Sequence, residues 1–154
     1  MAVADTKAVD EDATVSGSVA GNDTDADDNA VLTYAVNGTV PAGLSFSSDG
    51  SYTFDASDAA YQHLEQGATE AVVVGYTVTD EHGASATESV VITITGTNDA
   101  PTIASYGTHS GSVTENTQGS ANGFVYGTDV DNSARLSYGV QGSTSSSYGS
   151  FSVS

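Results

Sequence analysis

The stretch Val90-Val91-Ile92-Thr93-Ile94-Thr95, followed by Gly96-Thr97-Asn98-Asp99-Ala100-Pro101, decides how this chain is organised. Its first half places Val90, Ile92 and Ile94 on one face, and this period of two predicts a strand with a buried side. Proline cannot donate to a sheet ladder, so the strand has to end before Pro101. The side-chain oxygens of Asn98 and Asp99 are ligands that hard cations prefer. We therefore predict a domain boundary that can bind a cation.

The same period of two runs through the residues before this boundary. Strands are predicted at residues 13–20, 31–36, 44–46, 52–54, 69–79 and 84–95, with residues 2–9 as a first strand or an arm. Residues 57–66 break the pattern, and we expect one or two helical turns there, capped by Ser57 and ended by Gly67. About seven strands in about ninety residues, with turn signals between them, are typical of an all-β fold, a Greek-key β-sandwich.

An internal repeat defines the domain organisation. Residues 9–36 align with residues 113–140 without a gap. Apolar strand positions and acids recur: Val9, Glu11, Asp25, Asp27, Leu32, Tyr34 and Val36 match Val113, Glu115, Asp129, Asp131, Leu136, Tyr138 and Val140. We predict a complete repeat at residues 1–96, a connector at 97–101 and an incomplete second repeat at 102–154. Because the second copy has no counterpart of residues 52–95, we expect it to be loose or paired with something else.

The composition narrows the classes of partner. The formal net charge is −18, and Lys7 and Arg135 are the fixed cations of the sequence. Phosphate contacts demand clustered Lys and Arg, which argues against nucleic acid and against an anionic membrane surface. No apolar run approaches a membrane span, and no nucleophile elbow or paired catalytic acid is recognisable, so we expect no membrane insertion and no enzymatic activity. A bound cation is the natural counter-charge.

An Asp-x-Asp motif recurs in both copies, as Asp25-Ala26-Asp27 and as Asp129-Val130-Asp131. The first copy also resembles the opening of an EF-hand loop. That loop needs glycine at its sixth position and glutamate at its twelfth, where this chain has Asp28 and Tyr34, so the EF-hand interpretation fails. In a loop flanked by strands, the Asp-x-Asp spacing sends two carboxylates to the same side, which suits a shared calcium ion.

Strand directions distribute the acids over two ends of the predicted sandwich. The turn that holds Glu11 is expected where the last strand leaves, so Glu11, Asn98 and Asp99 should converge with Asp129 and Asp131. By the same reasoning the opposite end gathers Asp25, Asp27 and Asp80. The predicted calcium ligands, with the repeat counterpart of Glu11 included, are Glu11, Asp25, Asp27, Asp80, Asn98, Asp99, Glu115, Asp129 and Asp131.

Other polar residues have plainer interpretations. Asp80 suits a metal-free hairpin turn as well as a metal site. Further loop and strand acids are interpreted as solvated surface, namely Asp10, Asp12, Asp28, Asp55, Asp58 and Glu88. The three histidines, His63, His82 and His109, lack the spacing of a zinc site.

A family resemblance rests on several motifs taken together. They are Val9-Asp10-Glu11-Asp12, Asp25-Ala26-Asp27, Leu32-Thr33-Tyr34, Asp49-Gly50-Ser51-Tyr52-Thr53-Phe54, Tyr76-Thr77-Val78-Thr79-Asp80 and Gly96-Thr97-Asn98-Asp99-Ala100-Pro101. In this combination the chain resembles a VCBS-type, cadherin-like tandem repeat of bacterial RTX adhesins, over residues 9–101 and the front of a second copy. The resemblance implies tandem extracellular sandwiches of the cadherin/immunoglobulin-like kind, with calcium between them, in type I-secreted surface proteins. Asn116 departs from the pattern, because Asp12 is its counterpart.

The expected function is that of a calcium-stiffened extracellular spacer of a bacterial surface adhesin in attachment, aggregation or biofilm, with neighbouring repeats as partners. In this respect the chain resembles rhizobial cadherin-like calcium-dependent adhering proteins, which are similar to calcium-dependent lectins that bind their own exopolysaccharide. An alternative is therefore a calcium-dependent carbohydrate-binding module, which needs exposed aromatic residues such as Tyr106, Tyr126 or Tyr148 on one face. A third interpretation, an accessory domain of a secreted hydrolase, stays open.

Overall fold

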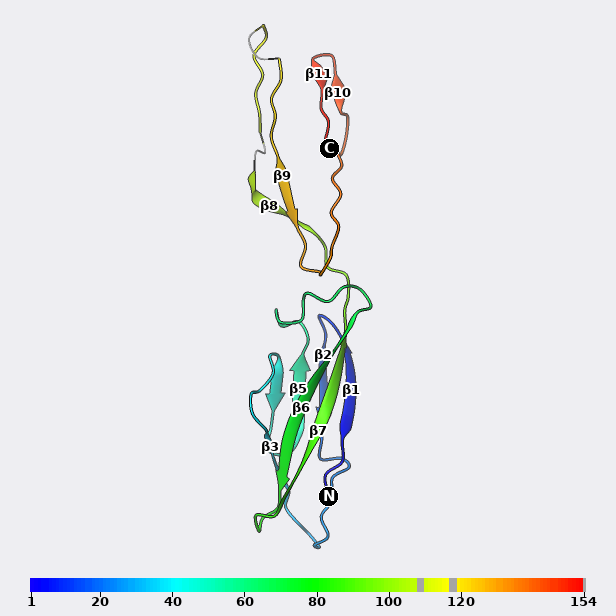
Figure 1. Ribbon diagram of the computed structural model, residues 1–154, viewed down its shortest axis with the longest axis vertical. Coiled ribbons are helices and arrows are strands. Elements are labelled where there is room, and N and C mark those ends of the chain that lie inside the picture. The colour runs from blue at the N-terminus through cyan, green and yellow to red at the C-terminus, as the bar shows by residue number, and fades with distance from the viewer. Residues whose placement is uncertain (108–109, 117–118, 154) are drawn as a thin grey trace. The chain divides into compact units, whose positions relative to one another are not determined.

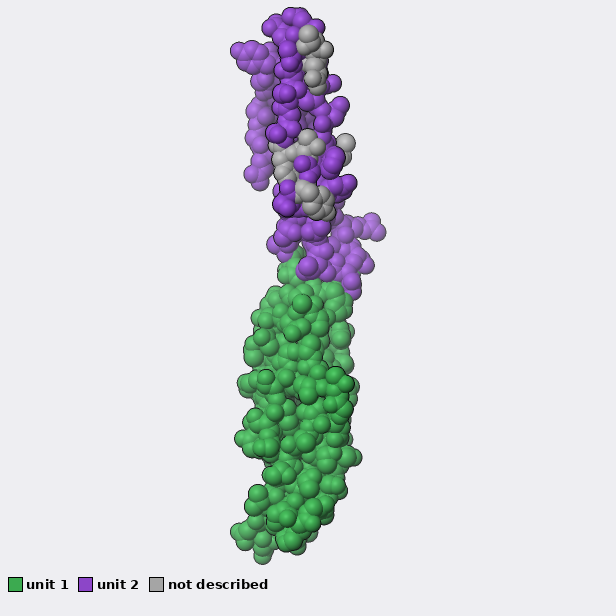
Figure 2. Space-filling model, turned by 90° about the vertical axis from the view of Figure 1, so that its left-hand side faces the viewer, with its two compact units in different colours: residues 1–99 green, residues 100–154 purple. Residues whose placement is uncertain are grey.

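The computed structural model describes residues 1–107, 110–116 and 119–153. The chain divides into two compact units, unit 1 from Met1 to Asp99 and unit 2 from Ala100 to Ser154 (Figure 2). The described residues form strands, turns and irregular segments and contain no helix. Accordingly, no helix among them has the length and apolar character needed to cross a membrane.

Unit 1 is a two-sheet β-sandwich, which confirms the predicted fold class. Its strands are β1 (Asp5–Asp10), β2 (Thr14–Ser18), β3 (Thr33–Val36), β4 (Leu44–Phe46), β5 (Ser51–Asp55), β6 (Thr69–Thr79) and β7 (Ser85–Thr95). One sheet has the order β1-β7-β6-β3 and the other the order β2-β5-β4 (Figure 1). The chain crosses from one sheet to the other after β1, β2, β3 and β5, as in Greek-key connections.

The core of unit 1 follows the alternation in the sequence. On β7, Val90, Ile92 and Ile94 are fully buried, and on β6 Val74, Tyr76 and Val78 lie on the same inner face. The second sheet contributes Phe54 and other buried residues to this cluster. Each such side chain stabilises the fold by about 1.5–3 kcal/mol relative to an exposed position. The long β6–β7 hairpin therefore forms one wall of the core.

Residues 57–66 are a correction to the sequence-based expectation, because they form hydrogen-bonded turns and no helical turn. The Tyr61 N–H donates to the Asp58 carbonyl at 3.0 Å and the Leu64 N–H to the Tyr61 carbonyl at 3.2 Å, both three-residue steps. Tyr61 inserts its ring beside Phe54, at 5.3 Å between centroids, and donates from its hydroxyl to the Ala42 carbonyl at 2.9 Å. Packing of this ring overrides the local helical tendency. Ser57 donates to Asp55 rather than acting as a cap.

The parallel pairing of β1 with β7 positions the functional residues of unit 1. All other strand pairs of this unit are antiparallel. Since β1 and β7 run in the same direction, with Asp10 opposite Thr95, both strands finish at the same end of the sandwich. We call this end, formed by residues 10–13 and 95–99, the Glu11 end. The opposite end, which holds the turn between β6 and β7, is called the Asp80 end.

Unit 2 holds short strand pairs and an open apolar surface. β8 (Thr102–Gly107) pairs with β9 (Val125–Thr128), and β10 (Ser145–Ser146) pairs with β11 (Gly149–Ser150). Large apolar side chains are exposed throughout the described part of the unit, among them Ile103, Val113, Phe124, Val130 and Phe151. Within the described part of unit 2, the two short strand pairs leave these side chains uncovered.

Backbone conformation supports the internal repeat. Among the described residues, four other than glycine have a positive φ: Asp12 at 66°, Asn29 at 61°, Asn116 at 64° and Ser133 at 60°. They form two pairs, because Asn116 aligns with Asp12 and Ser133 with Asn29 in the gapless alignment. Asn and Asp adopt the left-handed region more readily than most residues. Asn116 therefore departs from the first copy in charge and keeps its backbone conformation.

Asp5 yields a prediction about pH. Its Oδ1 accepts a hydrogen bond from Asn22 at 3.1 Å and its Oδ2 one from the Tyr76 hydroxyl at 3.4 Å. Partial burial raises the pKa of Asp5 above its ordinary value, and the charge of Asp23 adds to this effect while the Asn22 bond opposes it. A raised folded-state pKa disfavours the ionised form, so stability is lost as the pH rises through that pKa. Asp5→Asn should raise the melting temperature at pH 7, and the difference should shrink towards pH 4.

Asp49→Asn is a control, because it should change the melting temperature at pH 7 in the opposite direction to Asp5→Asn. The Ser51 hydroxyl and N–H hold the pKa of Asp49 below its ordinary value, so its contribution is present at neutral pH and is lost as the pH falls. This variant should melt at a lower temperature at pH 7, with the gap closing in acid. Destabilisation by Asp5→Asn at pH 7 would contradict the interpretation of Asp5.

Candidate metal centre

Glu11 is the residue that directly follows β1, and it lies at the end of unit 1 where β7 finishes. Its N–H donates to the Thr95 carbonyl at 2.8 Å, which extends the β1–β7 pairing by one step. Glu11 is 2% exposed, and among the described residues it is the one charged residue that is buried. The local fold therefore places a carboxylate inside the Glu11 end.

The two oxygens of Glu11 have different surroundings. Oε2 accepts a hydrogen bond from the Thr97 N–H at 2.9 Å. Oε1 is buried and accepts no hydrogen bond from any described residue. A buried carboxylate oxygen without a partner is costly, because the desolvation of the charge is not offset by a contact. Glu11 Oε1 is therefore a candidate ligand atom for a cation.

The connector brings further oxygens to Glu11. A carboxylate oxygen of Asp99 lies within 4.8 Å of one of Glu11. Asn98 donates from Nδ2 to the Asp99 carbonyl at 2.6 Å, and its Oδ1 is the ligand-type atom of that amide. Calcium binds oxygens at 2.3–2.6 Å, so two ligands of one ion lie at most about 5 Å apart. The spacing of Glu11 and Asp99 fits one calcium ion.

Asp12 and Thr97 are part of this arrangement and were missed by the sequence-based interpretation. The Thr97 hydroxyl donates to Asp12 Oδ2 at 3.4 Å, beside the Thr97 N–H that bonds Glu11. Asp12 was interpreted as solvated surface, and it is indeed exposed. The signal that could have identified it is the recurrence of an Asp or Asn directly after the glutamate in both copies.

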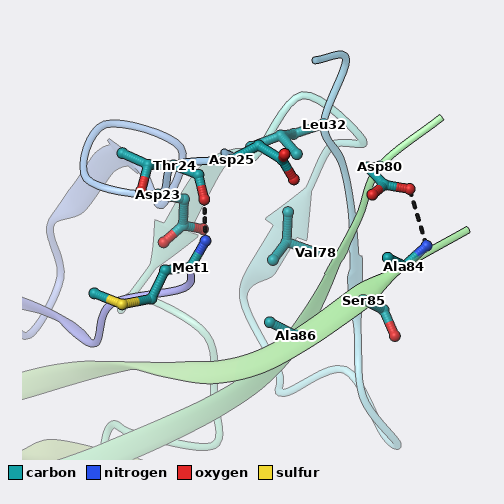
Figure 3. Close-up of a pocket in the computed structure, with 10 residues that line it drawn as sticks. All are labelled: Met1, Asp23, Thr24, Asp25, Leu32, Val78, Asp80, Ala84, Ser85 and Ala86. Atoms are coloured by element: carbon teal, nitrogen blue, oxygen red, sulfur yellow. Dashed lines mark hydrogen bonds between the residues drawn. The ribbon is translucent and has the colours of Figure 1, made fainter. Parts of the chain in front are cut away.

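The Asp80 end holds a second group of acids around a pocket of unit 1. Asp23, Asp25 and Asp80 line it together with apolar side chains such as Leu32 and Val78 (Figure 3). The structure thus brings Asp25 and Asp80 to one pocket, while Asp27 is not among its lining residues. Asp23 takes part although its counterpart in the second copy is Gly127.

Hydrogen bonds within loops occupy part of these carboxylates. Asp25 Oδ1 accepts from the Asp27 N–H at 2.9 Å. Asp80 Oδ1 accepts from the N–H groups of His82 and Ala84 at 2.8 and 2.9 Å. Partial desolvation raises the pKa of Asp80, but these backbone bonds outweigh it and hold the pKa below its ordinary value. Asp80 therefore organises the β6–β7 turn, and a metal role for it stays a prediction.

The predicted calcium ligands of unit 2 are Glu115, Asp129 and Asp131. Asp129 Oδ1 accepts from the Asp131 N–H at 3.0 Å, which repeats the Asp25–Asp27 bond of unit 1. Glu115 is exposed, whereas its counterpart Glu11 is buried. The difference follows from β7, which covers Glu11 and has no counterpart in the described part of unit 2. A calcium role for Glu115, Asp129 and Asp131 stays a prediction.

Of the three tyrosines that were expected to bind carbohydrate, the structure describes the side chains of Tyr126 and Tyr148. Tyr126 is 49% exposed and packs against Phe124, with 5.2 Å between ring centroids, while Tyr148 is 98% exposed. The side chain of Tyr106 and the whole of His109 lie outside the part of the chain that the structure describes.

Comparisons with known proteins point to one family. The sequence profile described as "Bacterial cadherin-like domain" matches residues 1–96. A comparison with curated proteins gave no significant match. Among solved structures, the chain is similar to a nucleoside hydrolase-related hypothetical protein from Saccharophagus degradans that is associated with carbohydrate metabolism, at 21% identity and a TM-score of 0.40. That match covers 58% of this chain and 22% of the solved chain.

Glu11 gives a prediction for the metal-free protein. Two carboxylates at the observed spacing repel by about 1 kcal/mol at solvent-like dielectric. Glu11→Gln removes this repulsion and keeps an oxygen for the Thr97 N–H, so in chelator the melting temperature should rise by about 4–8 °C. Glu11→Ala should lower it instead, because the variant leaves a cavity and an unpaired N–H.

Glu115→Gln is the matched control, since it changes the exposed counterpart of Glu11 in the second copy. It should leave the metal-free melting temperature unchanged. A fall in the melting temperature of Glu11→Gln in chelator would show that the buried charge is satisfied without a cation.

Proposed function

This chain belongs to the bacterial cadherin-like domain family, and on that premise we propose that it is a calcium-stiffened extracellular spacer repeat of a large bacterial surface adhesin. Membership of this family indicates an adhesin-type repeat, of a kind typically found outside the cell or at its surface. The proposal adds calcium as the ligand, stiffening as the mechanism, and attachment, aggregation or biofilm as the setting. It assigns no enzymatic activity to the chain.

The observation that carries the proposal is the buried Glu11 carboxylate at the end of unit 1. Its Oε1 has no hydrogen-bond donor among the described residues, and the Asp99 carboxylate stands within 4.8 Å. With two fixed cations in 154 residues, the sequence has few side chains that could neutralise such a pair. Calcium is a hard cation that takes six to eight oxygen ligands in flexible geometry. Carboxylate, amide and backbone oxygens at this end match that preference.

Calcium would act on the connector through Thr97, Asn98 and Asp99. The Thr97 N–H is bonded to Glu11 Oε2, so a cation held by Glu11 and Asp99 fixes both ends of this short segment. Without calcium the two carboxylates repel, and residues after β7 gain freedom. With calcium, binding to the folded state adds RT ln(1 + [L]/Kd) to stability, or about 2.7 kcal/mol at a hundredfold excess over Kd. The repeat is thus stiff in calcium-rich medium and pliable where calcium is scarce.

Two extensions of the proposal come from the sequence. The recurring Asp-x-Asp motif makes Asp129 and Asp131 candidate calcium ligands of unit 2. The Asp23, Asp25 and Asp80 pocket is a candidate second cation site. Neighbouring repeats are the proposed partners.

A calcium titration tests the proposal. Calorimetry on the full chain should give saturable binding at or below millimolar calcium, with weaker binding of magnesium, and the melting temperature should rise with calcium. Asp99→Asn should weaken calcium binding by about tenfold or more, the loss of one charged ligand. Glu88→Gln, a half-buried acid in the middle of β7, is the control and should bind like the unmodified chain. Absence of binding at millimolar calcium would refute the metal mechanism.

A carbohydrate-binding module is the second candidate, and one observation favours it. Phe124 and Tyr126 expose about half of their rings and touch one another in unit 2. Exposed aromatic pairs are suitable stacking surfaces for sugars. Glycan binding that Phe124→Ala removes would favour this function over the spacer, whereas glycan binding unaffected by that change would not.

A further inference from the structure

Asn37 directly follows β3, and the pairing of β3 with β6 fixes its backbone. Val36 lies opposite Tyr76, and the N–H of Asn37 donates to the Gly75 carbonyl at 2.8 Å. Gly38 follows with a positive φ of 78°, which suits a residue without a Cβ atom. Both Asn37 and Gly38 are exposed, and β3 is an edge strand of its sheet. The structure thus presents an Asn-Gly pair to solvent at a fixed strand end.

The hydrogen bonds of the Asn37 side-chain amide involve its oxygen and leave its nitrogen unbonded. Oδ1 accepts a hydrogen bond from the Thr77 hydroxyl at 2.7 Å, whereas Nδ2 donates to none of the described residues. Asn22 differs, because its Nδ2 donates to Asp5 at 3.1 Å. A donor at the oxygen draws electron density away from Cγ and stabilises negative charge that forms on Oδ1. The Asn37 amide is therefore prepared for attack at Cγ and for loss of its nitrogen.

The backbone nitrogen of Gly38 is the nucleophile next to this amide along the chain. Its N–H makes no hydrogen bond to a described residue, and no Cβ atom of residue 38 shields it. Attack on Asn37 Cγ closes a five-membered ring, an intramolecular step that avoids the entropic cost of bringing two molecules together. Each other asparagine of unit 1 is followed by a residue with a Cβ atom, namely Asp23, Ala30 or Asp99. Within unit 1 the reaction is therefore least hindered at Asn37.

We propose that Asn37-Gly38 is a self-modifying site at which unit 1 deamidates, with the Thr77 hydroxyl as the hydrogen-bond donor that assists the attack. The Gly38 nitrogen forms a bond to Asn37 Cγ, and the Cγ–Nδ2 bond breaks. The proton of the Gly38 nitrogen passes through water to the leaving nitrogen, which departs as ammonia. Water then hydrolyses the resulting succinimide at one of its two carbonyls, which gives aspartate or isoaspartate at position 37. No oxidant or reductant takes part.

Deamidation changes the end of β3 in charge and in connectivity. Either product replaces a neutral amide by a carboxylate, so a chain of formal charge −18 gains one more negative charge. Isoaspartate also adds one carbon to the main chain directly before Gly38, immediately after the Asn37 N–H bond to Gly75. The site therefore supplies a slow covalent change at an edge strand of unit 1. This inference does not depend on calcium.

Peptide mapping by mass spectrometry tests the site during incubation of the folded full chain at mildly alkaline pH. The peptide that contains Asn37 should gain about one dalton, because NH₂ is replaced by OH, and an isoaspartate-specific methyltransferase should label it. Thr77→Val should slow this gain by about threefold or more, a smaller loss than at a water-excluded oxyanion donor, because water reaches the exposed amide. Thr77→Ser keeps the hydroxyl and should keep the rate of the unmodified chain.

Asn122-Gly123 is the matched internal control, because it is the same dipeptide in unit 2 of the same molecule. Thr77→Val should leave the rate at Asn122 unchanged, and in strong denaturant it should no longer alter the rate at Asn37 either. Three results would each overturn the proposal: no mass gain at Asn37 in the folded chain, equal rates at Asn37 with and without the Thr77 hydroxyl, or a higher rate at Asn37 in denaturant than in the folded chain.

Discussion

The parallel pairing of β1 with β7 is the contact on which the rest of unit 1 depends. It joins the first and last strands of the repeat, so the turn after β1 and the segment after β7 emerge at the same end. The Glu11 N–H bond to Thr95 and the Thr97 N–H bond to Glu11 continue this pairing beyond the strands. The Glu11 carboxylate is thereby held next to Thr97, the first residue of the connector. Without that pairing Glu11 would lie in a solvated turn, as Glu115 does in unit 2.

The shortage of positive charge is the second constraint. Many loop acids are stabilised by backbone N–H groups instead of Lys or Arg: Asp25, Asp49, Asp55 and Asp80 each accept such a bond two residues further on. These bonds shape the turns in which the acids lie. Glu11 differs, because one of its oxygens is buried without a donor. The contrast separates acids that build turns from the acid on which the calcium proposal rests.

The sequence predicts most of the fold because periodicity is a local property. Strands β6 and β7 lie within one residue of their predicted bounds, since long alternating runs leave little ambiguity. The segment around Tyr61 was predicted wrongly as helical, because its conformation depends on a tertiary contact with Phe54. Likewise, the position of Glu11 beside the connector follows from strand directions, but its burial and the role of Thr97 depend on the β1–β7 register. The place of Asp23 in the pocket could not be inferred from the repeat, since its counterpart is glycine.

The most direct measurement is the ¹³C NMR signal of the Glu11 side-chain carboxylate during a calcium titration at constant pH. If Glu11 ligates calcium, this resonance shifts with the same saturation curve as that of Asp99, and magnesium reproduces the shift weakly. A Glu11 resonance that stays fixed while those of Asp25 and Asp27 move would contradict the account, because calcium would then bind away from the connector.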